Sequence, residues 1–289
     1  MRLLPTLALL VALPLAAAGA DLTVVGSDLL GEGFAKGVTD FARRIDLPVK
    51  LDLSGTRVGS ERLQAGGADL GLFVFTAHET PPGDQFVSLP VAYHTAVVVV
   101  PADLMLTQLT VQQLRTIYGD SEASPYRRWF DLGVIGDWSS SSILPTISGS
   151  GGGLSFDLFR FSVLTSPKLR PTVTVTEDAA AALKRISGKE GGIAVVPVLP
   201  AGQKQLKALL LARGTTDVAF GPTPDNLHSG DYPIRLPLYL VFRKDATKRL
   251  LPLLRFLFSE DAVPLWQGAQ LVPLPAQART AAVFGLEGP

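Results

Sequence analysis

The chain has 289 residues, no cysteine, and 26 basic against 26 acidic side chains, so its formal net charge at pH 7 is zero. The lack of cysteine excludes disulfide bonds, thiolate metal sites and cysteine nucleophiles. Balanced charge, with aromatic residues not interleaved with basic runs, argues against nucleic acid as a partner. A chain of this length can form two lobes with separate hydrophobic cores.

The first twenty residues are typical of a secretory signal peptide. Met1-Arg2 gives a charged start, residues 3–18 are almost wholly apolar, and Ala18-Gly19-Ala20 places small residues before Asp21. An uncleaved N-terminal anchor is the alternative, although the apolar stretch is short for a membrane span. We therefore expect a cleaved signal peptide over residues 1–20 and a periplasmic or secreted protein, with no lipobox cysteine to carry a lipid anchor.

Strands and helices alternate in the first part of the chain. The residue pattern predicts strands over 22–25, 49–53 and 68–75, and helices over 34–44 and 58–64. In the first helix, Phe34, Val38, Phe41 and Ala42 repeat with the spacing of an amphipathic helix that covers a sheet. Such alternation predicts a parallel α/β sheet with ligands at the carboxyl ends of its strands.

Two long apolar strands, over 91–100 and 234–242, bracket a segment with its own strand–helix order. We interpret them as crossings between a discontinuous lobe 1 (residues 21–95 and 236–289) and an inserted lobe 2 (residues 96–235). Further elements are expected in the inserted segment and in the tail: helices over 111–118, 156–164, 179–186, 250–258 and 262–268, and strands over 143–147 and 192–196.

Three turns rich in glycine and serine each follow a strand and precede a helix. They are Gly26-Ser27-Asp28, Ser54-Gly55-Thr56-Arg57 and Ser148-Gly149-Ser150-Gly151-Gly152-Gly153. A helix N-terminus has unpaired N–H groups and partial positive charge, so a glycine turn that opens a helix can hold an anion. Three such turns with hydroxyl side chains predict a site that surrounds a small oxyanion.

The order of these motifs resembles the phosphate-binding-protein-like family, the class II periplasmic substrate-binding proteins of ABC importers. The resemblance rests on Gly26-Ser27, Ser54-Gly55-Thr56, Ala68-Asp69-Leu70-Gly71, residues 109–119, Trp129 to Gly133, residues 151–156, Gly191 to Ala194 and Gly268 to Leu274. It implies a type II α/β fold with two lobes, central sheets flanked by helices and a hinge of two crossing strands. It also implies a solute-binding protein, monomeric and without a cofactor, that captures a phosphate-like oxyanion in the inter-lobe cleft for an importer permease.

The chain departs from the family pattern at two positions. Val74 stands where phosphate binders of the family place an aspartate that accepts a proton from the anion, and Ser148 stands where they place an arginine. A buried aspartate repels a ligand that lacks a proton, so its absence predicts more even competition between phosphate and sulfate.

We predict that residues of the three turns bind the ligand, namely Gly26, Ser27, Ser54, Gly55, Thr56, Arg57, Ser150, Gly151, Gly152, Gly153 and Ser155. Arg57 could bind two ligand oxygens and replace the missing positive charge. The alternatives are a solvent-facing Arg57 paired with Glu61, and a Ser155 that only caps the helix at Phe156. Asp28 is interpreted as a helix cap.

Catalysis is not expected, because no nucleophile elbow surrounds Ser150, the three histidines (His78, His94, His228) are far apart in sequence, and no phosphate-binding loop is complete. His94 is interpreted as a hinge-packing residue. The alternative function is a non-transport sensor or partner-binding module on the same fold, for which Phe73 and Phe75 would have to reach the cleft. Core packing is the other interpretation of these two rings.

Overall fold

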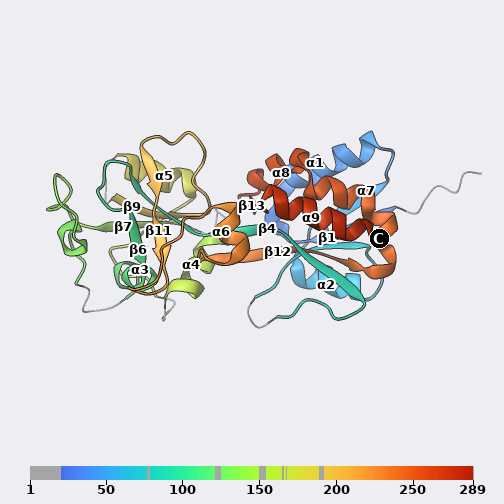
Figure 1. Cartoon of the computed structure of the whole chain (residues 1–289), viewed down its shortest axis with the longest axis horizontal. Helices are drawn as coiled ribbons and strands as arrows, with labels where there is room; N and C mark the ends of the chain where they lie inside the picture. The colour runs from blue at the N-terminus through green and yellow to red at the C-terminus, as the bar shows by residue number, and fades with distance from the viewer. Residues whose placement is uncertain are drawn as a thin grey trace, which may run out of the picture.

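The computed structural model of the protein describes residues 21–76, 79–120, 125–149, 154–164, 166, 168–188 and 192–288. These residues form two α/β lobes that lie side by side along the long axis of the molecule (Figure 1). Each lobe has its own sheet with helices packed against it, as the sequence predicted. The predicted signal peptide lies outside the described residues.

Lobe 1 is built on a six-stranded sheet in the order β13-β4-β12-β3-β1-β2. Its strands are β1 (Leu22–Gly26), β2 (Val49–Asp52), β3 (Leu70–Val74), β4 (Phe86–Thr95), β12 (Arg235–Arg243) and β13 (Val272–Pro273). β1 pairs in parallel with β2 and β3, as predicted. β12 returns from lobe 2 and is antiparallel to both β3 and β4, so the whole sheet is mixed, and the parallel arrangement predicted from the alternating elements holds for β1, β2 and β3.

Helices cover both faces of this sheet. They are α1 (Gly31–Arg44), α2 (Thr56–Gln64), α7 (Thr247–Phe258), α8 (Val263–Gly268) and α9 (Ala276–Glu287), with short 3-10 helices η1 (Asp28–Leu30), η4 (Lys244–Ala246) and η5 (Glu260–Ala262). α1 buries Phe34, Val38 and Ala42. Figure 1 shows α2 on one side of the sheet and α1, α7, α8 and α9 on the other. Phe73 is buried with Leu63 of α2, so it packs in the core.

Lobe 2 is built on a five-stranded sheet in the order β10-β5-β9-β7-β8. Its strands are β5 (Val97–Pro101), β7 (Leu144–Ser148), β8 (Thr174–Thr176), β9 (Gly192–Val196) and β10 (Leu206–Ala208), while β6 (Gln108–Thr110) and β11 (Leu210–Ala212) form a separate pair. Its helices are α3 (Val111–Tyr118), α4 (Ser155–Val163), α5 (Ala179–Ser187), α6 (Pro224–Ser229) and the 3-10 helix η2 (Trp129–Leu132). The Thr110 hydroxyl accepts a hydrogen bond from the Gln113 N–H at 3.0 Å and so fixes the start of α3.

The predicted strand over 91–100 is two strands in different sheets, because β4 ends at Thr95 and β5 begins at Val97. At this point the first crossing segment is bonded to the second. The Thr95 hydroxyl donates to the Ile234 carbonyl at 2.7 Å, and the Tyr232 hydroxyl donates to the Ala96 carbonyl at 2.9 Å. These bonds lie beside the predicted lobe boundaries, which stay a prediction.

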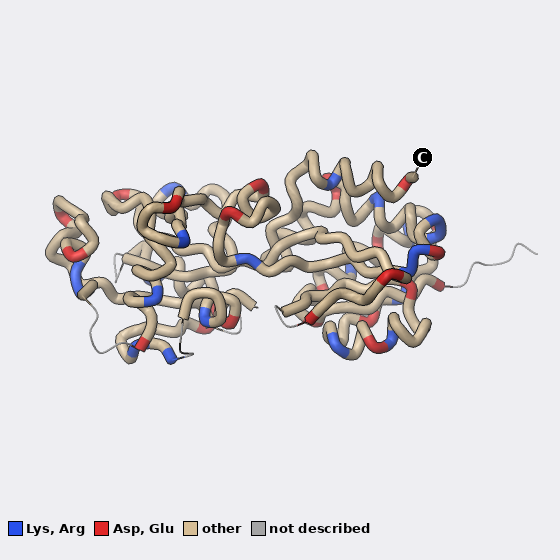
Figure 2. Tube along the Cα trace, turned by 60° about the horizontal axis from the view of Figure 1, so that its bottom comes forward, with Lys and Arg blue, Asp and Glu red and all other residues tan. Residues whose placement is uncertain are grey.

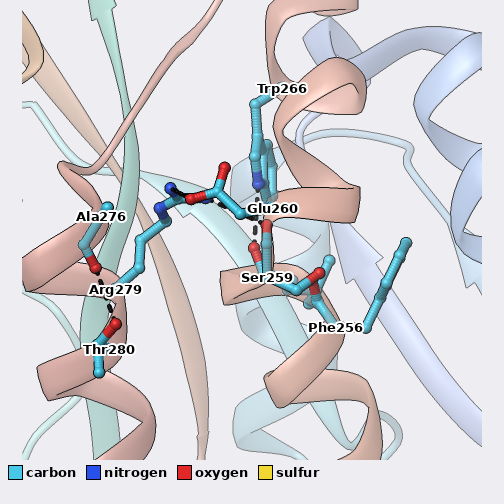
Figure 3. A network of polar contacts seen from close by, with 8 residues as sticks. Phe256, Ser259, Glu260, Trp266, Ala276, Arg279 and Thr280 are labelled. Atoms are coloured by element: carbon cyan, nitrogen blue, oxygen red, sulfur yellow. Dashed lines mark hydrogen bonds and ion pairs between the residues drawn. The ribbon is translucent and has the colours of Figure 1, made fainter.

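The C-terminal helix α9, which the sequence pattern did not predict, is attached to lobe 1 through a buried arginine (Figure 3). Arg279 Nη2 contacts Glu260 Oε1 at 2.6 Å and Nη1 donates to the Ser259 carbonyl at 3.2 Å. The Arg279 side chain is 7% exposed, while that of Glu260 is 76% exposed. In the same network, Trp266 Nε1 donates to the Leu257 carbonyl at 3.0 Å and joins α8 to α7.

Candidate functional site

The carboxyl ends of β1 and β3 face lobe 2. β3 is parallel to β1, and because β12 is antiparallel to both β3 and β4, β3 also runs in the same direction as β4. β4 leads directly into lobe 2. The first two predicted turns therefore lie at the edge of the lobe 1 sheet where parallel strands present their ligand-binding groups.

The first turn packs tightly against β3. A Cβ atom at Gly26 would lie 2.7 Å from the Leu72 Cβ, so only glycine fits there. The N–H of Ser27 donates to the Leu72 carbonyl at 2.9 Å. The Ser27 side chain is 3% exposed, and its Oγ accepts a hydrogen bond from the Leu29 N–H at 3.3 Å. Ser27, and not Asp28, is therefore the residue that caps η1, and its O–H remains available as a donor.

The second turn is bonded to the first through the backbone. Gly55 has a φ of +118°, which only glycine adopts readily, and its N–H donates to the Gly26 carbonyl at 2.9 Å. The Thr56 hydroxyl accepts from the Val74 N–H at 3.3 Å, and the Ser54 hydroxyl donates to Asp52 at 2.8 Å. The ends of β1 and β3 and the start of α2 thus form one connected group, with Ser54 directed to the carboxylate of β2.

Arg57 lies on the exposed side of α2. Its side chain is 82% exposed, and Nη1 pairs with Glu61 Oε1 at 3.2 Å, which is the alternative weighed from the sequence. An exposed ion pair of this kind contributes well under about 1 kcal/mol, so the guanidinium can exchange Glu61 for another anion at little cost. A ligand-binding role for Arg57 stays a prediction.

The third turn is only partly described, because Ser150, Gly151, Gly152 and Gly153 lie outside the described residues. Ser155 is the first residue of α4 and is 2% exposed. Its hydroxyl makes no hydrogen bond to the described residues and does not cap the helix. Ser148, at the end of β7, is fully buried and its hydroxyl likewise lacks a partner among them.

A cavity of about 520 Å³ lies between the lobes. It is lined by the start of α1, the end of β4, the start of α4 and α8 with the residues that follow it. Leu29 and Leu30, just after Ser27, form part of its wall, and Ser155 forms another part. Residues that follow the first and third turns therefore share one cavity wall, but none of the described residues of the three turns themselves lines it. The predicted ligand-binding residues of the turns stay a prediction.

His94, at the end of β4, is a cavity residue whose role the sequence did not indicate beyond hinge packing. It is 6% exposed, and its Nε2 makes no hydrogen bond to the described residues. Burial lowers the pKa of His94 to about 4, so the imidazole is neutral at physiological pH. Gln270, which has a φ of +57°, is another wall residue; it lies in the Gly268 to Leu274 motif, but no role in the site was predicted for it.

Metal-binding groups and the distribution of charge also bear on what the protein can bind. Within the described ranges, no three His, Asp or Glu side chains are grouped so that they could hold a metal ion. Figure 2 shows basic and acidic residues interspersed along both lobes, with neither lobe carrying one sign of charge. Binding of a charged ligand would therefore depend on hydrogen-bond donors in the site more than on the long-range electrostatic field of the protein.

Comparison with known proteins places this fold in a family. A sequence model of the PBP superfamily domain matches residues 14–261 of the chain. The chain belongs to the PBP superfamily. Among its relatives, the phosphate-binding protein PstS of Pseudomonas aeruginosa is 24% identical over 281 residues, which cover 91% of this chain and 86% of the relative.

Two crystal structures share the fold of this PBP superfamily member. One is a possible phosphate binding protein from Planctomyces limnophilus, with a TM-score of 0.66 and 20% identity over 93% of this chain and 98% of the other. The second is an ABC-type phosphate transport receptor from Vibrio cholerae, with a TM-score of 0.61 and 19% identity over 88% of this chain and 100% of the other. No helix in the part of the chain that the structure describes is long and apolar enough to cross a membrane.

Proposed function

We propose that this chain is an exported solute-binding protein that captures a small, phosphate-like oxyanion between its lobes and delivers it to the permease of an ABC importer. It binds the ligand without transforming it, and it acts as a monomer. The observation that carries the proposal is the hydrogen bond from the Gly55 N–H to the Gly26 carbonyl, which joins two hydroxyl-bearing turns at the sheet edge facing lobe 2. Membership of the PBP superfamily and the names of the Pseudomonas and Vibrio proteins support the same function.

The chemistry of these turns suits an oxyanion. The Ser27 hydroxyl has a free donor, and α2 begins at Thr56 with unpaired backbone N–H groups. Hydrogen bonds from such donors to an ionised oxygen are shorter and stronger than bonds to a neutral acceptor. Ser150, the Gly151–Gly153 backbone and Ser155 would supply donors from lobe 2, and Arg57 would move from Glu61 to the ligand.

Closure of the lobes would complete the site. The only covalent links between the two sheets among the described residues are the segments from β4 to β5 and from lobe 2 into β12. Domain closure about a few such residues is the usual response of two-lobed binding proteins to a ligand. The ligand would then be held by donors from both lobes.

The ligand selectivity would differ from that of a binder with an aspartate in the site. The Val74 side chain is buried in the lobe 1 core, so it offers no acceptor for a ligand proton. Phosphate and sulfate would therefore compete more evenly here than in a site that accepts such a proton.

Calorimetric titration of the purified chain with phosphate and with sulfate near pH 7 tests this function. The variant Thr56→Val should weaken phosphate binding about tenfold or more, because it removes a hydroxyl beside the anion. Thr56→Ser should retain most of the affinity, which separates the loss of the hydroxyl from a general disturbance of α2. If neither anion binds to the unaltered chain, the proposal fails and a sensor or partner-binding role gains support.

A further inference from the structure

Helix α6 of lobe 2 contacts both strands that cross between the lobes. Figure 1 shows it at the junction of the two lobes. On its lobe 2 side, Leu227 is fully buried in a cluster with Leu211, and the Gly230 carbonyl just after the helix accepts a hydrogen bond from Arg213 Nη2 at 2.8 Å. α6 is therefore fixed to lobe 2, and its contacts with β4 and β12 join that lobe to the lobe 1 sheet.

The first of these contacts is with Tyr93 on β4. The Tyr93 hydroxyl and His228 Nδ1 share a hydrogen bond of 3.0 Å, and the two rings meet edge to face with their centroids 6.3 Å apart. Tyr93 is 2% exposed, so its hydroxyl needs a partner inside the protein, and His228 supplies it. A side chain of the lobe 1 sheet is thus bonded to a helix of lobe 2.

The second contact is with Arg235 at the start of β12. Arg235 Nη1 donates to the carbonyls of Leu227 at 2.6 Å and of His228 at 3.3 Å. Its guanidinium also lies over the Tyr93 ring, 5.4 Å from the centroid. The last carbonyls of a helix have no partner within the helix and attract a positive charge. Gly230 leaves room for this contact, since a Cβ atom there would lie 2.8 Å from Arg235 Nη2. Arg235 therefore holds the end of α6 against Tyr93.

Tyr93 and the inter-lobe cavity lie on opposite sides of the crossing strands. Neighbouring residues of a strand point to opposite faces, and no irregularity interrupts the pairing of Tyr93 with Pro237 and of His94 with Leu236. His94 lines the cavity, so Tyr93 points away from the cavity and toward α6. A rotation of the lobes that narrows the cavity therefore moves α6 away from Tyr93.

The lobes are not closed over the first two turns in this arrangement. Among the residues that the structure describes, no hydrogen bond or ion pair joins residues 26–28 or 54–57 to lobe 2. The Arg57 side chain, at the start of α2, is 82% exposed. The contacts between α6 and the crossing strands thus belong to an arrangement that closure would replace.

We propose that α6 is a latch on the hinge: its contacts with Tyr93 and Arg235 stabilise the separated lobes and are broken when the lobes close on a ligand. A protein whose binding-competent form is only partly populated binds its ligand more weakly in the same proportion. The latch therefore lowers the affinity for the ligand and favours its release. The effect on affinity rests on the proposed function, whereas the effect on the arrangement of the lobes does not.

The arrangement of the lobes can be measured on the ligand-free chain. The chain has no cysteine, so Lys36→Cys on α1 and Lys184→Cys on α5 place two spin labels at exposed positions, one on each lobe. Figure 1 shows both helices on the same side of the molecule, so closure on that side shortens the distance between the labels. Double electron–electron resonance gives the distribution of this distance.

Three substitutions are compared in the labelled chain. Tyr93→Phe and His228→Ala each remove the hydrogen bond between lobe 1 and α6. Tyr239→Phe is the matched control, because it removes a hydroxyl from β12 that makes no hydrogen bond to the described residues. Calorimetric titration with inorganic phosphate is carried out on the same variants without labels.

Loss of the hydrogen bond should raise the ratio of short to long label distances about fivefold in Tyr93→Phe and in His228→Ala, the effect of one such bond. The double variant should show the same fivefold change and not the product of two, because both substitutions remove one interaction. Phosphate should bind about fivefold more tightly to each of these variants. Tyr239→Phe should change neither measurement.

Unchanged label distances in both single variants, or a shift to longer distances, would overturn the proposal. Independent effects that multiply in the double variant would also overturn it. The phosphate titration is judged separately. Shorter distances without any binding of phosphate would support the latch and contradict the oxyanion function. Phosphate binding that is no tighter in Tyr93→Phe and His228→Ala than in the unaltered chain would support that function and overturn the latch.

Discussion

At the scale of single residues, burial makes His94 differ from an ordinary histidine. The pKa of His94 falls from 6.5 to about 4 because its ring is removed from water, and none of the described residues that line the cavity beside it is charged. Between these two pH values the unfolded chain binds a proton that the folded chain does not. The contribution of His94 to the free energy of unfolding is therefore largest above pH 6.5 and falls as the pH drops toward 4.

We expect this loss to reach about 3 kcal/mol at most, since each unit of pKa shift corresponds to about 1.4 kcal/mol. Urea denaturation at several pH values between 4 and 7 measures it. His94→Gln should flatten the pH dependence over this range. His228→Gln, which alters an exposed histidine, should retain the original dependence because His94 is still present. An unchanged slope in His94→Gln would contradict the assignment.

The residues of the candidate site differed in how well they could be predicted. Ser27 and Thr56 could be assigned to one edge because strand-to-helix turns on parallel strands meet there, and the bonds around Gly26 and Gly55 agree with that rule. The cavity as a whole could not be predicted. Ser155 was an expected ligand-binding residue and Gln270 lies in a motif of the family, but Leu29 and His94 belong to no motif, and the four residues are far apart in sequence. Only the fold brings them to one wall.

At the scale of elements, Arg279 holds α9 against the end of α7. Its guanidinium is buried and bonded to Glu260 and to the Ser259 carbonyl, while its Nε has no partner among the described residues. Removing it would take away a buried side chain and both of these hydrogen bonds, and would open space beside α9. The Arg279 side chain therefore contributes more to holding α9 against lobe 1 than the exposed ion pairs of α9 do.

We expect Arg279→Ala to lower the free energy of unfolding by about 2 kcal/mol, measured by chemical denaturation, because it removes a buried side chain and its hydrogen bonds. Arg255→Ala is the matched control, because it breaks another pair between α7 and α9, that of Arg255 with Glu287, whose side chains are 56% and 39% exposed. That exposed pair should contribute less than about 1 kcal/mol. Equal losses of unfolding free energy in the two variants would contradict the prediction, because burial of Arg279 would then add nothing to its pair with Glu260.

The elements that could be predicted are those with a strong apolar repeat. α1 has Phe34, Val38 and Ala42 on its buried face, and β9 is apolar throughout and is bounded by Gly192 and Pro197, so both were expected within a few residues of their bounds. α9 shows no clear apolar face in its sequence, where alanine is the commonest residue, and its Phe284 is 79% exposed, so the residue pattern does not predict it. Strands of three residues such as β6 are too short to show any repeat.

At the scale of the whole molecule, two side-chain hydrogen bonds join the crossing segments in addition to the pairing of β4 with β12, and one of the two can be removed by a small substitution. The Tyr232 ring is fully buried, and its hydroxyl donates to the Ala96 carbonyl at 2.9 Å. Tyr232→Phe keeps the ring and removes only this donor. We expect it to lower the free energy of unfolding by about 1–2 kcal/mol, because a buried carbonyl loses its partner.

Tyr239→Phe provides the comparison for this hinge bond, since the Tyr239 hydroxyl on β12 makes no hydrogen bond to the described residues. It should leave the stability nearly unchanged. The two variants can be compared by thermal and urea unfolding under the same conditions. If Tyr232→Phe is as stable as Tyr239→Phe, the hydrogen bond from Tyr232 to the Ala96 carbonyl contributes nothing measurable to the stability of the protein.

The placement of β12 between β3 and β4 also determines when lobe 1 can form during protein synthesis. β3 ends at Val74, but its neighbour β12 begins only at Arg235, after the whole of lobe 2. A chain emerging from the ribosome can assemble the lobe 2 sheet from contiguous residues while the lobe 1 sheet still lacks its central strand. Pairing between such distant segments is slow, so the N-terminal part stays unfolded until translation is nearly complete. Such a delay leaves the apolar strands β1 and β3 without their neighbour β12 while the sheet of lobe 2 can already be complete.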